Sequence, residues 1–167
     1  FLTMLCIIRL HYPEYNINEL LNNNEGVAIF SGTINGLFGQ LFNKGKFSEI
    51  GEIFSKLKSN YGDRFYIEIQ RHGDQNEKEF EKFNLINSQK LEIPIIATNE
   101  VFYIDKEMHE AHDALICIGN KTYVNEKSRI RLSKQHYFKD NFEFVIQVFV
   151  SFVRCSVAMR CRAFDVA

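Results

Sequence analysis

The amino-acid sequence predicts an α/β fold built on a parallel sheet. Three short strand-like segments alternate with three segments of helical spacing, an order typical of a parallel sheet with helices outside it. The chain has 167 residues, of which 46% are apolar and 16 are Phe. This composition suffices for the core of one ordinary domain. Because sites form where the strands of such sheets end, functional groups are expected there.

The first predicted strand lies in residues 26–32, GVAIFSG, where a short apolar run closes in Ser and Gly. Three glycines in and after this run, Gly32, Gly36 and Gly39, are spaced loosely like those of a phosphate-binding loop. The segment lacks Gly-Lys-Ser/Thr and the Gly-x-Gly-x-x-Gly spacing, so it carries neither nucleotide-binding fingerprint. We interpret it as a turn into a helix.

A helix is predicted next, because apolar residues recur three or four positions apart until Gly62 ends the pattern. These residues are Phe47, Ile50, Ile53, Phe54 and Leu57. The following residues 64–70, RFYIEIQ, alternate between apolar side chains on one face and Tyr, Glu and Gln on the other. A period of two residues predicts a strand.

The second helix is predicted to begin at Asn76, with Glu79 three residues later in a capping-box arrangement, and to continue to Leu91. A proline then opens the third predicted strand, residues 94–98 with the sequence PIIAT. The two predicted strands are thus joined through a helix, as a parallel sheet requires.

The third helix is predicted over residues 105–118, with Gly119 just beyond its end. Its apolar residues Ala111, Leu115 and Ile118 are expected on the inner side of the helix, against the rest of the core.

The two ends of the chain are harder to assign. Residues 1–25 carry no assigned element. In residues 141–167, apolar residues alternate from 142 to 152 as in a strand, whereas the length of the run and the sequence RCSVAMRCR that follows suit a helix. We favour a helix there.

Charge and cysteine content exclude several classes of protein. The chain has 20 Lys+Arg against 21 Asp+Glu, so the whole molecule has no basic excess to hold a phosphate backbone. Its cysteines show no Cys-x-x-Cys spacing and are too sparse for a disulfide framework, which favours the cytoplasm: Cys6, Cys117, Cys155 and Cys161. The N-terminal residues lack the features of a targeting signal, and the apolar stretch 142–153 is too short for a membrane span. No membrane partner is expected.

Three ordered segments resemble the later part of the polymerase and histidinol phosphatase (PHP) domain family: GDRFYIEIQRHG at 62–73, IPIIATNEVFYID at 93–105 and EAHDALICIGN at 110–120. The most similar form is that of the bacterial DNA polymerase III alpha subunits. The resemblance covers roughly residues 26–143, and the family's opening His-x-His motif is absent. The chain therefore divides into an unassigned segment 1–25, a PHP portion 26–140 and a C-terminal segment 141–167.

The resemblance implies that the chain supplies part of a (β/α)7 barrel of parallel strands with outer helices. It also implies a cytoplasmic fragment of a replicative DNA-directed DNA polymerase, a nucleotidyltransferase. In this fragment the PHP portion acts as a scaffold and lacks the polymerase active site, so no catalytic residue is assigned and the isolated chain is expected to be inactive. The implied partners are the rest of the alpha subunit and the proofreading exonuclease subunit, with DNA bound through the full-length protein.

Metal-binding members of the family carry Asp, any residue and His after the ATN segment, where residues two apart face the same side. Here Glu100 and Phe102 hold those places. Phe has no lone pair to give to a metal, so we interpret the site as vestigial. No cofactor is expected in this fragment, whereas metal-retaining relatives use zinc, manganese or magnesium.

Two histidines are weak candidates for such a site. His72 directly follows the second strand and could reach the strand end, although a loop histidine bonded to the backbone is an equally ordinary interpretation. His109 and His112 are three residues apart rather than the four of a zincin helix, so His112 remains a weak candidate. The simpler interpretation of this pair is one histidine on the helix surface and one partly buried, capping or packing at the sheet edge.

A basic segment interleaved with tyrosines could contact nucleic acid through charge and stacking: Lys121, Lys127, Arg129, Arg131 and Lys134. A solvated loop is the simpler interpretation. Two alternative functions therefore stand beside the polymerase fragment. One is a metal-dependent phosphoesterase or 3′–5′ exonuclease of the PHP family, and the other is a stand-alone nucleic-acid-binding module.

Overall fold

Three short parallel strands form an open sheet at the centre of the molecule. The computed structural model describes residues 17–22, 24–140 and 142–144. Within them, β1 (Ile29–Phe30), β2 (Phe65–Ile69) and β3 (Ile95–Ala97) lie side by side in chain order, and both pairings are parallel. The predicted α/β class with a parallel sheet is confirmed. The described residues form three strands of an open sheet and not a closed barrel.

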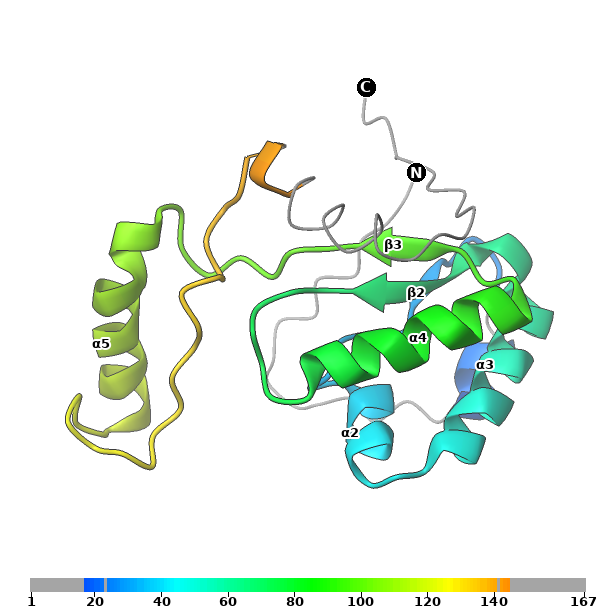
Figure 1. Cartoon of the computed structure of the whole chain (residues 1–167), viewed down its shortest axis with the longest axis horizontal. Helices are drawn as coiled ribbons and strands as arrows, with labels where there is room; N and C mark the ends of the chain where they lie inside the picture. The colour runs from blue at the N-terminus through cyan, green and yellow to red at the C-terminus, as the bar shows by residue number, and fades with distance from the viewer. Residues whose placement is uncertain (1–16, 23, 141, 145–167) are drawn as a thin grey trace.

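Helices connect the strands as the sequence predicts. The helices are α1 (Ile17–Asn22), α2 (Leu37–Asn43), α3 (Phe47–Tyr61), α4 (Glu77–Leu91) and α5 (His109–Asn120), with short 3-10 turns at Gly62–Arg64 and Lys106–Met108. α2, α3 and α4 lie together on one side of the sheet (Figure 1). α1 falls in the N-terminal segment to which no element was assigned.

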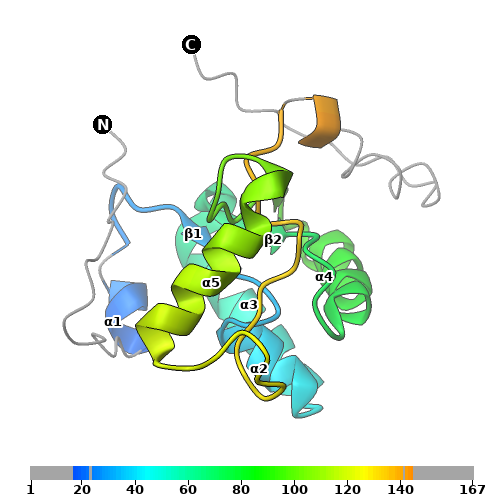
Figure 2. The ribbon, with the colours of Figure 1, turned by 90° about the vertical axis from the view of Figure 1, so that its left-hand side faces the viewer.

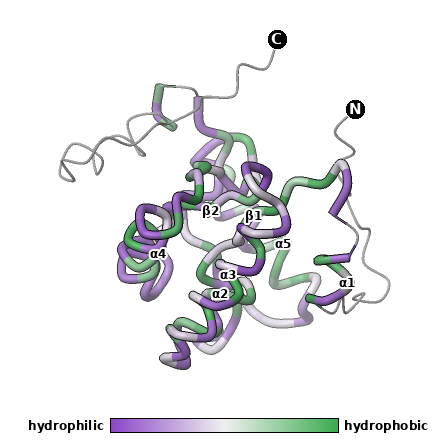
Figure 3. Tube along the Cα trace, turned by 90° about the vertical axis from the view of Figure 1, so that its right-hand side faces the viewer, coloured by the Kyte–Doolittle hydropathy of each residue, from purple (hydrophilic) through white to green (hydrophobic). Residues whose placement is uncertain are grey.

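The core lies between α3, α4 and β2. Phe65, Ile67 and Ile69 of β2 are buried while the residues between them are half-buried, which confirms the alternation predicted for this strand. The Phe54 ring of α3 contacts the Phe38 and Phe65 rings at centroid distances of 4.7 and 5.6 Å. Hydrophobic and hydrophilic segments alternate along α3 and α4, as Figure 3 shows. This is the pattern of helices with one face against a core.

Two glycines have positions that a side chain would disturb. Gly62 has a φ of 60° and its N–H bonds to the carbonyl of Lys58, so it ends α3 as predicted. At Gly39 a Cβ atom would stand 2.0 Å from the carbonyl oxygen of Ile34. Only glycine fits at position 39, because the backbone of Ile34 packs directly against it. Close packing therefore accounts for Gly39, one of the three glycines spaced loosely like a phosphate-binding loop.

The start of α4 differs from the predicted capping box. Asn76 has a left-handed backbone, φ 62°, and its side-chain amide donates to Asn43 Oδ1 at 3.0 Å and caps no helical N–H. The Glu77 carboxylate instead accepts the backbone N–H groups of His72 and Gly73, both at 2.8 Å. The turn between β2 and α4 is closed by this buried carboxylate.

The inner side predicted for α5 is wrong. His109, Asp113 and Cys117 are the buried residues of this helix, whereas Leu115 and Ile118 are 62% and 75% exposed. α5 stands apart from the layer of α2, α3 and α4 and packs on the loop that follows it (Figures 1 and 2). Because arginines from that loop approach α5, its polar side faces inward. The helix also runs one residue past Gly119, to Asn120.

The ends of the chain lie largely outside the described residues. Of the C-terminal segment 141–167 only 142–144 are described, and they are helical. Cys6, Cys155 and Cys161 fall outside the description, while Cys117 is buried as a free thiol. Among the helices that the structure describes, none combines the length and apolarity needed to cross a membrane.

Candidate strand-end site

Polar side chains gather where β2 and β3 end. The Gln70 amide donates to Thr98 Oγ1 at 2.8 Å and to Glu68 Oε1 at 3.1 Å. The Thr98 hydroxyl in turn donates to Glu68 Oε1. This network joins the carboxyl ends of two neighbouring parallel strands, which is the place where the sequence predicts a site.

His72 lies buried beside this network and is 2% exposed. Its ring stacks on that of His136, with centroids 4.0 Å apart and planes inclined by 12°. Its Nε2 accepts the backbone N–H of Glu100 at 3.3 Å, and its buried Nδ1 has no hydrogen-bond partner. Burial first, then the positive charges that His136 and Lys139 can carry, lower the pKa of His72 to about 4. His72 is therefore neutral at physiological pH. It lies after the end of β2 and bonds to backbone, and its role as a site residue stays a prediction.

Glu100 and Phe102 lie at the strand-end site, but neither side chain is arranged as a metal ligand. The Glu100 side chain is exposed, and its backbone connects the two stacked rings, because its carbonyl lies 3.2 Å from His136 Nδ1. The Phe102 ring packs on the rings of His136 and His112 at 5.3 and 5.7 Å. His112 is thus held in aromatic contacts, also with Tyr103.

Lys139 closes the site from the last loop. Its Nζ donates to Asn99 Oδ1 at 2.8 Å and to the carbonyl of Gln135, and it lies 4.7 Å from the centre of the Tyr137 ring. Burial lowers the pKa of this lysine below its usual value of 10.5. No sequence motif points to Lys139 or His136, because each comes from a loop more than 30 residues beyond the strand ends.

The residues of this site do not fit the metal cluster that the PHP resemblance implies. A metal ligand needs a lone pair that points at the ion, and Phe102 offers none. The lone pair of His72 Nε2 is already used by the N–H of Glu100. Within the described part of the chain there is no group of three or more His, Cys, Asp or Glu side chains that could hold a metal ion.

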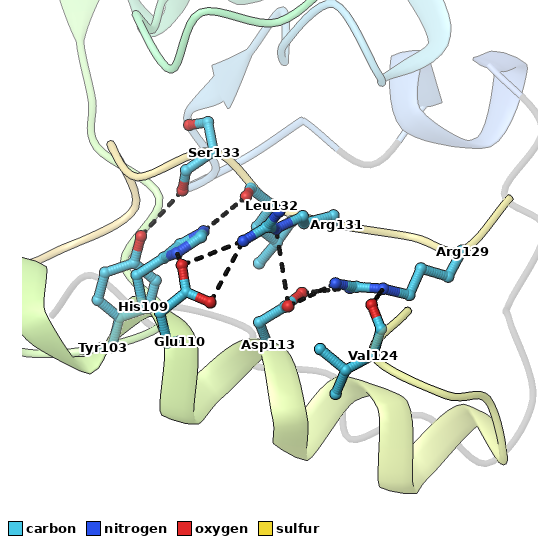
Figure 4. A network of polar contacts seen from close by, with 9 residues as sticks. All are labelled: Tyr103, His109, Glu110, Asp113, Val124, Arg129, Arg131, Leu132 and Ser133. Carbon is cyan, nitrogen blue, oxygen red and sulfur yellow. Dashed lines mark hydrogen bonds and ion pairs between the residues drawn. The ribbon is translucent and has the colours of Figure 1, made fainter. Parts of the chain in front are cut away.

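The basic segment is partly neutralised by α5. Arg129 forms a bidentate ion pair with Asp113, in which Arg129 Nη2 lies 2.6 Å from Asp113 Oδ2 (Figure 4). Arg129 Nε also donates to the carbonyl of Val124. Arg131 contacts Glu110 at 3.1 Å and Asp113 at 3.6 Å. Of the five basic residues considered for nucleic acid, only the lysines are left exposed without such a pair: Lys121, Lys127 and Lys134.

His109 belongs to the same network. Its Nε2 lies 2.9 Å from the carbonyl of Leu132, and Tyr103 donates its hydroxyl to the carbonyl of Ser133 at 2.9 Å (Figure 4). The histidine pair of α5 therefore divides, because His109 binds the following loop while His112 faces the strand-end site.

Fold and site together define an α/β protein of the parallel-sheet class with a buried, packed set of polar groups at its strand ends. No protein-family model matches the chain. It is 34% identical over 122 residues to DNA polymerase III subunit alpha of Caulobacter vibrioides, which covers 72% of this chain and 11% of that protein. The same subunit of Rickettsia prowazekii is 34% identical over 125 residues, 75% of this chain and 11% of the relative. That of Vibrio cholerae is 27% identical over 134 residues, 80% of this chain and 12% of the relative.

These relatives identify the chain as a segment of the DNA polymerase III alpha subunit family. The chain spans about one tenth of the length of the curated relatives it matches.

Proposed function

We propose that the chain acts as a structural part of the PHP-type domain of a replicative DNA polymerase III alpha subunit and performs no chemistry of its own. The observation that carries this proposal is the packing of Phe102 on His136 and His112, in a segment similar to those alpha subunits. The Phe102 ring has no lone pair for a metal and instead contacts two histidine rings from its partly exposed position, which supports a structural role for the strand-end site.

The proposed barrel is supported by the direction of the strands. β1, β2 and β3 are parallel and in chain order, with α2, α3 and α4 on one side of the sheet, as in part of a (β/α)7 barrel. Strands β1 and β3 each have one neighbour among the described residues. In the proposed assembly, the remaining strands come from the rest of the alpha subunit.

The proposed partners follow from the same assignment. They are the rest of the alpha subunit and the proofreading exonuclease subunit, with DNA held by the complete polymerase in the cytoplasm. No metal cofactor is proposed for this portion. We expect the melting temperature of the purified chain, followed by circular dichroism, to stay unchanged when zinc or manganese is added, because a native-state ligand would raise it.

The alternative is a metal-dependent phosphoesterase or 3′–5′ exonuclease, and one observation favours it. His72 Nδ1 is buried without a hydrogen-bond partner, and it would become a nitrogen ligand if the ring proton moved to Nε2, at the cost of the bond from the Glu100 N–H. An upward shift of the melting temperature with metal, together with chelator-sensitive release of nucleotides from single-stranded DNA, would support this alternative and contradict the scaffold.

A chimera tests the scaffold directly. In it, this chain replaces the matching segment of the Caulobacter vibrioides alpha subunit, and DNA synthesis is measured on a primed template. We expect the chimera to synthesise DNA, because the proposed role is structural and the polymerase chemistry lies elsewhere in the subunit. A folded chimera with no DNA synthesis would contradict the proposal.

A further inference from the structure

α5 has its polar side buried and its apolar side exposed, the reverse of an ordinary surface helix. His109, Asp113 and Cys117 follow one another at four-residue spacing and are buried against the loop. On the opposite side, Leu115 and Ile118 are exposed, and so is Met108, the residue that directly precedes the helix. We call this second set the outer face of α5. Further exposed apolar side chains adjoin it in sequence: Ile104, Tyr123 and Val124.

The contacts of the buried side of α5 leave the apolar side chains of its outer face exposed. Asp113 and His109 bind Arg129 and the carbonyl of Leu132, so the loop is held to α5 by polar bonds. An isolated helix of 12 residues is marginal in water, and most helical stability in proteins comes from burying an apolar face. Because the buried side of α5 is polar, its outer face is the apolar face that remains available for packing.

We propose that the outer face of α5 is a docking surface inside the alpha subunit, covered by another part of the same polypeptide. This inference rests on the proposed function. The matched relatives carry about nine tenths of their length outside the segment that this chain represents, so a large amount of polypeptide is available to cover the face. The partner's chemistry follows from the face itself: it presents aliphatic or aromatic side chains to Leu115 and Ile118.

The size of the face favours this occupant over a second copy of the chain. A helix of 12 residues is about 18 Å long and about 10 Å wide, so one face covers roughly 200 Å². A specific complex between separate molecules buries roughly 800 Å² on each partner. A contact within one polypeptide avoids most of the loss of translational freedom, so a small apolar face suffices there.

Cysteine accessibility tests whether the face is covered. Leu115→Cys is compared with Ile86→Cys, a matched control on α4, because Leu115 and Ile86 are 62% and 66% exposed. Each substitution is made in this chain and in the chimera with the Caulobacter vibrioides alpha subunit. The rate of maleimide labelling is measured by tandem mass spectrometry, because fragment ions between residues 115 and 117 separate the added thiol from that of Cys117.

In the isolated chain we expect both cysteines to react at rates within about twofold of each other. In the chimera we expect labelling at Leu115→Cys to slow at least about tenfold, because a covered site reacts only when it opens, while Ile86→Cys stays unchanged. Equal labelling at Leu115→Cys in chain and chimera would overturn the proposal. So would labelling of both sites at the rate of the urea-unfolded chimera.

The remaining outcomes distinguish failure of the docking surface from failure of the proposed scaffold function. Concentration-dependent protection of Leu115→Cys in the isolated chain, with a dimer in sedimentation, would assign the face to a second copy and overturn the inference. A chimera that synthesises DNA while Leu115→Cys stays reactive overturns the docking surface alone. A chimera that protects Leu115→Cys but synthesises no DNA contradicts the scaffold function and supports the surface.

Discussion

Asp113 of α5 and Arg129 of the following loop form a bidentate ion pair in which both side chains are almost fully buried. The hydrogen bond from Arg129 holds the pKa of the Asp113 carboxyl below its usual 3.8, and Arg131 adds to the effect. A guanidinium matches a carboxylate in this geometry better than a lysine would. The pair is the main charged link between α5 and the loop that crosses its buried side.

The first prediction concerns this pair. Asp113→Asn and Arg129→Gln should each lower the melting temperature by several degrees, because each leaves a buried polar partner unpaired. The double variant should lose much less than the sum of the two single losses. Lys127→Gln is the control, since Lys127 belongs to the same basic segment but is exposed and outside the ion pairs with α5. An equal loss in Lys127→Gln, followed by circular dichroism, would contradict the assignment.

Local periodicity predicted much of the fold. The bounds of α3, the alternation of β2 and the position of β3 all follow from residues within a single element, where the period of the apolar side chains decides. Periodicity did not predict the buried side of α5. That side is determined by the ion pair between Asp113 and Arg129, which are 16 residues apart in the sequence. Leu115 and Ile118 follow the period of a helix but face outward.

The candidate site was predicted only where it lies next to a strand. His72 and Glu100 follow β2 and β3 closely, so topology alone brings them to one edge. His136 and Lys139 reach the same place through a long loop. No spacing rule connects residues so far apart, and one sequence without further information carries no signal for them.

The second prediction concerns the start of α4. Glu77→Gln should destabilise the chain by about 1–3 kcal/mol, because an amide has only one acceptor oxygen for the two backbone N–H groups of His72 and Gly73. The matched control is Glu79→Gln two residues on, at the exposed position where the sequence placed a capping box. Urea unfolding measures both. A loss for Glu79→Gln as large as that for Glu77→Gln would contradict the role assigned to the Glu77 carboxylate.

The third prediction tests the core. Phe54→Ala should cost about 3–5 kcal/mol, because it removes a fully buried ring packed between Phe38 and Phe65. Phe138→Ala is the control, since Phe138 is exposed. A loss this large is a substantial fraction of the stability of a small domain, so the variant is expected to unfold at low urea concentration. Comparable midpoints for the two variants would argue against the core described above.

The fourth prediction is a pH dependence that arises from His72. Its pKa is about 4 in the folded chain, against an ordinary value of 6.5 for an unfolded imidazole. Between these values the unfolded chain binds a proton that the folded chain does not bind, so stability falls as the pH falls from 6.5 to 4. A full shift of this size corresponds to roughly 3 kcal/mol, and solvent screening reduces it, so we expect a loss of about 1–2 kcal/mol.

His72→Gln isolates this contribution, because its amide oxygen can still accept the N–H of Glu100 but does not titrate. The loss of stability between pH 6.5 and 4, measured by urea unfolding, should be smaller in the variant than in the unsubstituted chain. The comparison is necessary because Glu77 acts in the opposite direction: burial raises its pKa, so its protonation favours the folded chain as the pH falls. If His72→Gln and the unsubstituted chain lose stability in parallel, His72 is not the group that titrates.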